Sequence, residues 1–242
     1  MLFNLSPIQY TLSFLVITTG TLLQGSVGFG LGLLSVPILL LIDPSFIPGP
    51  ILLIAFFLNI FIIIRERKSI DFKGLQWIIP GRLIGTIIGA SLLKIFPEDL
   101  IGLFFGSIIL LAVVLSISGL QLTFNARNQV SVGTLSGFMA TTIGVGGPPL
   151  ALLYQNASGK KLRGTLSAIF LLGTLFAIIS LISIGKFGLK EFILAISLIP
   201  AIVVGFYLSG KITRYLDRGF IRPAVLIIST ASALIVIIKY II

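Results

Sequence analysis

The stretches QGSVGFGLGLLSVPILL (residues 24–40) and TTIGVGGPPLALLY (residues 141–154) decide the fold, because each places a glycine cluster and proline inside a long apolar run. Such clusters interrupt helices. Around them, 57% of the 242 residues are hydrophobic and 10% are charged, with a mean hydropathy of +1.18. A soluble domain is about half apolar and a quarter charged. The composition therefore predicts an all-α polytopic membrane protein and excludes a water-soluble enzyme or a disordered chain.

Histidine and cysteine are both absent. Their absence removes disulfides, thiolate nucleophiles, Ser–His hydrolysis and the usual nitrogen and sulfur metal ligands. Ser136, in GTLSG, therefore has no histidine for a rhomboid-like protease, and the carboxylates all fall in loops or at membrane edges. We expect no enzyme activity, no metal and no cofactor. A purely structural subunit gives no reason for paired helix breaks, which free backbone groups that lipid cannot satisfy.

Eight apolar blocks are separated by short polar segments. Because about 20 apolar residues cross roughly 30 Å of hydrocarbon, six blocks are expected to be ordinary single spans. These six are residues 48–64, 75–93, 100–120, 165–184, 191–208 and 223–241. The other two, 8–42 and 130–155, carry the glycine clusters, and the first would be about 52 Å long as one straight helix.

The basic residues decide whether the two interrupted blocks cross the membrane. If both blocks return to the side they entered, 12 of the 17 Lys and Arg share one side, four lie opposite, and Arg82 lies inside a span. If block 130–155 crosses once, the sides hold eight each. Because cytoplasmic loops are enriched in Lys and Arg, a re-entrant segment or hairpin is favoured. We expect a multi-pass protein of a bacterial-type inner membrane, with both termini on the non-cytoplasmic side.

This topology predicts two inverted repeats, residues 1–125 and 126–242, each a Gly/Pro-broken segment followed by three transmembrane helices. The segments IDFKGLQWIIPGRLIG, from Ile70, and KEFILAISLIPAIVVG, from Lys190, share a proline and a following glycine 120 residues apart. Chance similarity between two apolar stretches is the alternative. Inverted repeats with paired broken helices are typical of secondary transporters, whose substrate site lies near the midplane.

The two broken segments supply the candidate substrate site, since half-helix N-termini offer free N–H groups to an anion. The candidate residues of these segments are Gln24, Gly28, Gly30, Gly32, Pro37, Thr141, Thr142, Gly144, Gly146, Gly147, Pro148 and Pro149. Asn59 and Arg82 join them from neighbouring spans. For the polar side chains, interhelical hydrogen bonding is the alternative use. Arg82 lies about 10 Å into its span, where it either holds an anion or snorkels to the headgroups.

Other polar and small residues are expected to serve structure. Lys160, Lys161 and Arg163 are interpreted as topology anchors, with recruitment of cytoplasmic anions as the alternative. A further set of glycines is expected to allow close helix packing. This set comprises Gly20, Gly85, Gly89, Gly102, Gly106, Gly119, Gly173 and Gly205.

The chain carries two glycine motifs, GFGLG at 28–32 and TTIGVGGPPLALLY at 141–154. In these motifs it resembles the TauE/SafE family, also called the sulfite exporter or toluenesulfonate uptake family. Leu31 stands where many members have another glycine. The resemblance covers essentially the whole chain and implies a transporter of sulfite, sulfonates or related sulfur-containing organic anions. The expected partners are this small anion and the lipid bilayer, with no nucleic acid; a homo-oligomer stays open.

The scarcity of buried acids shapes the expected mechanism, because proton relays need intramembrane carboxylates. A membrane potential that is negative inside favours anion efflux by about 2.3 kcal/mol per charge per 100 mV. We therefore expect facilitated export by alternating access around a midplane site formed by the broken segments. The alternatives are an importer or ion-coupled carrier of another small anion, or a non-transporting membrane subunit.

Overall fold

The computed structural model describes residues 5–97, 100–157, 159–216 and 221–241, and over these residues the chain is helical without strands. The α-helices are α1 (Pro7–Val27), α2 (Leu31–Ile42), α3 (Gly49–Glu66), α4 (Leu75–Ile95), α5 (Ile101–Ile117), α6 (Ala126–Ile143), α7 (Gly147–Leu153), α8 (Gly159–Ser183), α9 (Leu189–Ser197), α10 (Ile199–Leu216) and α11 (Ile221–Ile241). Short 3-10 helices are η1 (Pro44–Phe46), η2 (Arg67–Ser69) and η3 (Phe72–Gly74).

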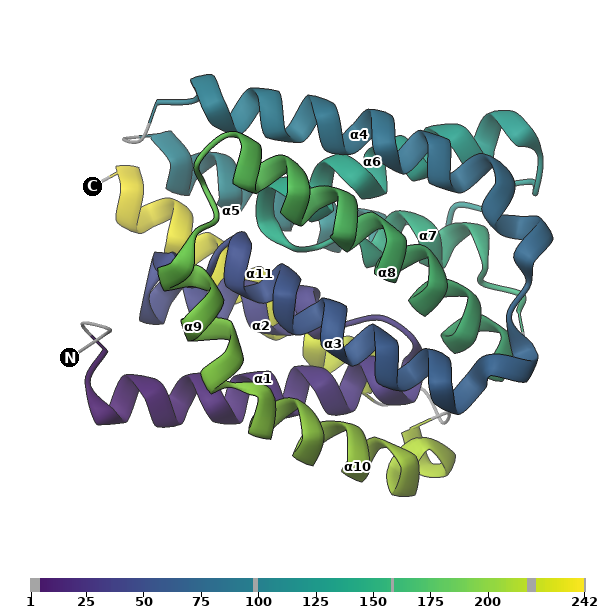
Figure 1. Cartoon of the computed structure of the whole chain (residues 1–242), viewed down its shortest axis with the longest axis horizontal. Coiled ribbons are helices and arrows are strands. Elements are labelled where there is room, and N and C mark those ends of the chain that lie inside the picture. Colours follow the sequence, from purple (N-terminus) through teal and green to yellow (C-terminus); the bar gives the residue numbers. More distant parts are fainter. Residues whose placement is uncertain (1–4, 98–99, 158, 217–220, 242) are drawn as a thin grey trace.

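Both long apolar blocks break at the glycine clusters, as the sequence predicts. Helix α1 ends at Gly28 (φ +103°), and Gly30 (φ +129°) precedes α2; helix α6 ends at Gly144 (φ +80°), three residues before α7 begins. These positive φ angles favour glycine because it has no Cβ. After each break the chain folds back along the helix it has just left (Figure 1).

The chain reversals lie at two ends of the bundle. In Figure 1, α1 begins and α11 ends on the left, together with the connections from α2 to α3 and from α8 to α9. The connections from α3 to α4 and from α7 to α8 lie on the right. The first of them holds Arg67, Lys68 and Lys73, and Lys160 and Lys161 follow the second at the start of α8. The predicted basic residue Arg218 lies outside the described residues. The described basic clusters thus gather at the end opposite the start of α1.

Three described segments are long and apolar enough to cross a membrane: Gly49–Ser69, Phe72–Ile95 and Gly159–Ser183. The span predicted over 191–208 is not one straight helix: α9 and α10 together are long and apolar enough to cross a membrane, but they are bent by 42°. Pro200 explains the bend, since its ring removes a backbone N–H and clashes with the carbonyl four residues earlier. Helix α5 and residues 226–238 are apolar but shorter.

Helices α4 and α6 pack closely because their contact surfaces consist of glycines. A Cβ at Gly85 would contact the carbonyl oxygen of Thr134, and one at Gly137 would contact the backbone of Arg82. The packing role is also confirmed for Gly20, Gly89, Gly106 and Gly205, each of which faces another helix. It is wrong for Gly119, where a Cβ would meet nothing and φ is +63°, as a turn requires. For Gly102 it stays a prediction.

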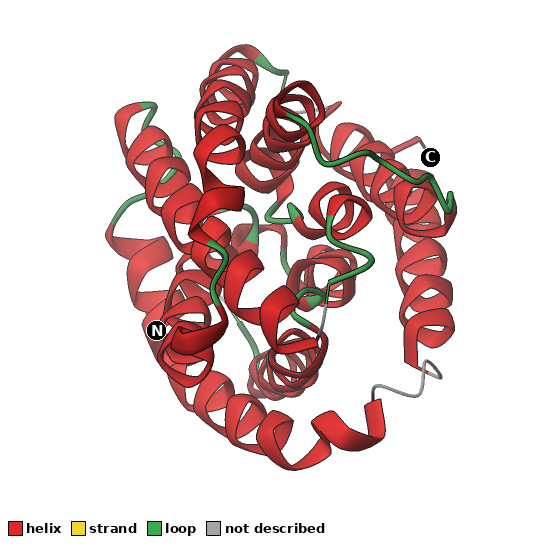
Figure 2. Cartoon of the chain, turned by 90° about the vertical axis from the view of Figure 1, so that its right-hand side faces the viewer, coloured by secondary structure: helices red, strands yellow, loops and turns green. Residues whose placement is uncertain are grey.

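The remaining helix–helix contacts enclose the two broken segments, α1–α2 and α6–α7, within the bundle. Helix α1 packs on α10 and α2 on α11, while α7 packs on α5 and α3 on α8. Figure 2 looks nearly along the helix axes and shows loop segments in the middle of the bundle, surrounded by helices. Gly28, Gly30, Val145 and Gly146, at the two breaks, are buried. The two breaks therefore lie in the protein interior, where backbone groups freed by the helix ends are shielded from lipid.

Candidate functional site

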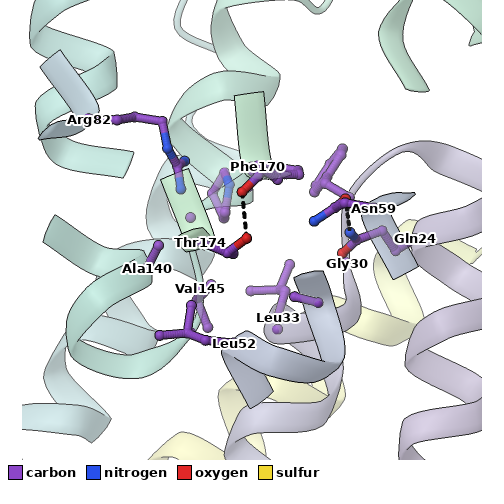
Figure 3. Close-up of a pocket in the computed structure, with 17 residues that line it drawn as sticks. Gln24, Gly30, Leu33, Leu52, Asn59, Arg82, Ala140, Val145, Phe170 and Thr174 are labelled. Atoms are coloured by element: carbon purple, nitrogen blue, oxygen red, sulfur yellow. Dashed lines mark hydrogen bonds between the residues drawn. The ribbon is translucent and has the colours of Figure 1, made fainter. Parts of the chain in front are cut away.

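A cavity of about 30 Å³ lies where the two breaks meet. It is lined by Gln24, Phe29, Gly30, Gly32, Leu33, Leu52, Ala55, Asn59, Arg82, Ala140, Gly144, Val145, Gly146, Gly147, Pro148, Phe170 and Thr174. Residues from α1, α2, α3, α4, α6, α7 and α8 thus converge on one point (Figure 3). A cavity of this size holds one or two water molecules. An anion of four or more heavy atoms requires it to widen.

Nine of the 14 residues that the sequence proposes for the site line this cavity, and five do not. Gly28 packs against the backbone of Arg163, and Pro37 and Pro149 are buried inside α2 and α7. Thr141 donates to the hydroxyl of Thr86 at 3.2 Å, an interhelical bond, and Thr142 donates to the carbonyl of Phe138 at 2.8 Å. The Thr141 bond is the interhelical use given as the alternative, whereas the Thr142 bond stays within α6.

Sequence reasoning missed the walls of the cavity. They include Phe29, Leu33, Leu52, Ala55, Ala140, Val145, Phe170 and Thr174. The apolar members carry no signal in an apolar chain, because any span offers many such residues. Thr174 is the exception as a hydroxyl within a span, but its Oγ1 donates to the carbonyl of Phe170 at 2.8 Å (Figure 3).

Arg82 is the charged residue of the cavity, and its side chain is 0% exposed. Its Nη1 donates to the hydroxyl of Ser136 at 2.6 Å, and its guanidinium lies 5.5 Å from the centre of the Phe170 ring. Its Nε and Nη2 have no hydrogen-bond partner among the described residues. The side chain therefore points into the bundle (Figure 3) and does not snorkel to the membrane surface.

Gly173 makes room for this guanidinium. A Cβ on Gly173 would contact Nε, Nη2 and Cζ of Arg82. The glycine therefore does not serve helix-backbone packing, as the sequence suggested, but accommodates a charged side chain. Nε and Nη2 form one edge of the guanidinium, the geometry that binds an oxyanion with two parallel hydrogen bonds. In this structure the edge lies against Gly173, so an oxyanion reaches it only after the side chain or α8 shifts.

No carboxylate offsets the charge of Arg82 in the described part of the chain. The ion pairs found there join Arg65 and Arg163 to Glu66, and Lys161 to Asp71. The described residues that line the cavity include no acid. Because an unpaired buried cation is costly in a membrane, such a residue usually marks a cavity that binds a counter-ion.

A second polar group of the cavity comes from the first half of the chain. Gln24 donates through Nε2 to Oδ1 of Asn59 at 3.1 Å and accepts from the backbone N–H of Leu31 at 3.3 Å. Asn59 is 0% exposed, and its Nδ2 finds no acceptor in the described ranges. Figure 3 shows this nitrogen on the cavity side of the side chain. Asn59 thus adds an unused donor to those of Arg82.

The family model described as Sulfite exporter TauE/SafE matches residues 12–236. The chain belongs to the TauE/SafE family. No curated protein and no solved structure matches it. The TauE/SafE proteins are transporters rather than enzymes, and the apolar helices described above agree with a multi-pass integral membrane protein.

This TauE/SafE protein also buries a second arginine, near the end of the bundle that carries the basic loops. The Nε of Arg163 lies 3.0 Å from Oε1 of Glu66, and its Nη1 donates to the carbonyl of Ser26 at 3.1 Å. Arg65 pairs with the same carboxylate at 3.3 Å and donates to the carbonyl of Gly25. Arg163 is 5% exposed and Glu66 8%. Arg163 is therefore a buried structural ion, and its role as a topology anchor stays a prediction.

Lys161, in contrast, lies at the surface. Its ammonium is 2.8 Å from Oδ2 of Asp71, and this hydrogen bond lowers the pKa of the Asp71 carboxyl. Lys160, Lys161 and Arg163 fall in the first turns of α8, which begins at Gly159 and not at the predicted residue 165. The helix thus extends past the expected membrane edge, and its first turns hold α8 to the loop between α3 and α4.

Proposed function

We propose that this protein exports sulfite, a sulfonate or a related sulfur-containing organic anion by alternating access around the cavity between the two breaks. One observation carries the proposal: Arg82 is completely buried beside this cavity, and among the described residues its Nε and Nη2 have no partner and no acid lines the site. A mobile anion completes this arrangement, because it supplies both the missing charge and the missing acceptors.

The site suits an anion with several oxygens on one centre. The unpartnered Nε and Nη2 of Arg82, which lie against Gly173, supply two parallel donors once the cavity widens, and the Nδ2 of Asn59 supplies a third. Helices α2 and α7 begin at the cavity, so the positive ends of their dipoles face it. The N–H of Leu31 already bonds to Gln24, and Pro148 and Pro149 have no N–H, so the dipoles contribute more than free donors do. A sulfonate or sulfite has three oxygens for these donors. The ring of Phe170 borders the space where an organic substituent would lie.

Packing supports the proposed inverted repeats, residues 1–125 and 126–242. A Cβ at Gly85 would contact the carbonyl of Thr134, and a Cβ at Gly205 would contact the carbonyl of Thr18. These pairs are equivalent under the shifts that align the Pro/Gly segments and the glycine motifs. Contacts of α4 with α6 and of α5 with α7 recur as α10 with α1 and α11 with α2. The counterparts α3 and α8 run in opposite directions in Figure 1.

The energetics favour export without proton coupling. The cavity holds no described acid that could carry a proton, and a proton relay needs such a group. The basic end of the bundle is placed in the cytoplasm of a bacterial-type inner membrane by the positive-inside rule, with both termini outside. An interior-negative potential then drives each negative charge outward by about 2.3 kcal/mol per 100 mV.

The test is transport by the purified full chain in liposomes with a set potential. We would follow the anions sulfite, sulfoacetate and thiosulfate and the zwitterion taurine, which carries no net charge, with protein-free liposomes as the control. The expected result is a protein-dependent flux of at least one of these anions whose direction follows the potential. A flux indifferent to the sign of the potential would overturn the uncoupled mechanism. No flux of any of the four would overturn the sulfur-anion assignment.

A further inference from the structure

A chain of two short hydrogen bonds links Arg82 to the second broken helix. Nη1 of Arg82 donates to Oγ of Ser136 at 2.6 Å, and this hydroxyl donates to the carbonyl of Gly146 at 2.6 Å. Ser136 is 0% exposed and does not line the cavity. It therefore connects α4, α6 and the segment between α6 and α7 from behind the site.

The direction of these bonds gives the hydroxyl a role that no apolar residue can take. Arg82 can only donate and the Gly146 carbonyl can only accept, so the group between them must accept on one side and donate on the other. A serine hydroxyl does both. With Nη1 held in this way, the opposite edge of the guanidinium, Nε and Nη2, is the part that stays free.

The arrangement joins the two proposed halves, with Arg82 in the first and Ser136 in the second, and it has no counterpart at the equivalent positions. The shift of 120 residues that aligns Pro80 with Pro200 places Ile202 opposite Arg82. The shift of 116 residues that aligns the glycine motifs places Gly20 opposite Ser136. The space beside Gly20 holds the hydroxyl of Ser35, which donates to the carbonyl of Val16 and not to a charged group. A hydroxyl bonded to an arginine is therefore specific to the Arg82 side.

We propose that Ser136 is a positioning residue for anion transport: it orients the guanidinium of Arg82 toward the site and holds the second break at the same time. This rests on the proposed function, because Arg82 is the residue that meets the anion. Binding of an anion to the free edge of Arg82 then acts on the break through the same hydroxyl. The anion site and the segment that must move in alternating access are thereby joined by one side chain.

The first test compares Ser136→Ala with Ser13→Ala in reconstituted liposomes, with sulfite as the probe. Ser13 is an equally buried serine whose hydroxyl bonds to the carbonyl of Gln9 in its own helix, outside the cavity. Loss of a charge-assisted hydrogen bond predicts a rise in KM of about 10-fold for Ser136→Ala, with Vmax within about threefold. Ser13→Ala is expected to leave both unchanged. An unchanged KM in Ser136→Ala would overturn the proposal.

The second test needs no substrate. Hydrogen-exchange mass spectrometry on the same variants is expected to show faster amide exchange over residues 144–148 in Ser136→Ala, since the Gly146 carbonyl loses its donor, and no change in Ser13→Ala. Equal exchange in Ser136→Ala and the wild type would show that Ser136 does not hold the break. If wild-type protein moves no sulfite, the assigned substrate fails, and this exchange experiment still decides the coupling.

Discussion

Two buried arginines of this protein have opposite surroundings. Arg163 lies against a carboxylate and a backbone carbonyl, whereas Arg82 has one serine hydroxyl and two unpartnered nitrogens. A buried charge costs several kcal/mol unless it is paired, and removal of one partner leaves the other uncompensated. The comparison separates an arginine that stabilises the fold from one whose Nε and Nη2 have no partner among the described residues. Under the proposed function, the missing partner is the transported anion.

Replacement of Arg82 by Gln is expected to have the largest effect on transport. Loss of two hydrogen bonds from a charged donor predicts a fall in kcat/KM of about 1000-fold, which corresponds to about 4 kcal/mol. Thermal stability should stay equal or rise, because an uncompensated buried charge is removed. Flux assays and scanning fluorimetry on one preparation check both. A lower Tm together with unchanged KM would assign Arg82 to structure.

Replacement of Glu66 by Gln is expected to give the opposite result. Arg65 and Arg163 would lose their shared carboxylate, so we expect the free energy of unfolding to fall by about 3 kcal/mol. The matched control is Asp71→Asn, which breaks the exposed pair with Lys161 and should cost less than about 1 kcal/mol. Because Lys161 lowers the pKa of Asp71, this small contribution is present at neutral pH and is lost as the pH falls through the lowered pKa. Denaturation at pH 7 and in acid checks both variants.

Replacement of Gly173 by Ala tests whether the place of the guanidinium matters, with the charge kept. The new methyl group would occupy the position now held by Nε and Nη2 of Arg82, so the side chain must move from the site. We expect kcat/KM to fall about 30-fold, less than for loss of the arginine, because part of the attraction survives displacement. Gly210→Ala is the control, since a Cβ there meets nothing within 4 Å. Equal transport by the two variants would contradict the assigned position.

The positions of both breaks follow from local chemistry and are therefore readable in the sequence. Gly28, Gly30 and Gly144 have positive φ angles, which only a residue without Cβ adopts at low cost. The bend at Pro200 was missed although the proline is visible, because Pro80 sits inside α4 without ending that helix. Surrounding helices decide whether a proline bends or breaks a membrane helix.

The sequence predicts which polar residues belong to the candidate site, but it does not predict how far apart their side chains lie. A lone arginine within a span identifies Arg82, but the sequence leaves open which way its side chain points. That choice depends on Ser136 and Gly173, which lie 54 and 91 positions away along the chain and carry no signal of their own. For a similar reason, the sequence does not distinguish Thr141 from Asn59 as a candidate for binding the substrate. Both are polar residues in apolar helices, and only packing shows that one is bonded to another helix and the other has a donor to spare.

Substitutions of Asn59 and Thr141 are expected to have the smallest effects on transport. They also compare two residues that the sequence proposes for the site, one of which lines the cavity while the other does not. Asn59→Ala removes an unpartnered donor at the cavity, so we expect KM for the transported anion to rise about 10-fold. Thr141→Val removes a hydroxyl that bonds to Thr86 outside the cavity, so KM should change less than about twofold. Both side chains are 0% exposed, and neither substitution removes a charge, so the pair controls for burial. If Thr141→Val raised KM as much as Asn59→Ala, the anion would have to lie nearer α6 than the cavity lining indicates, and Arg82 would no longer mark its centre.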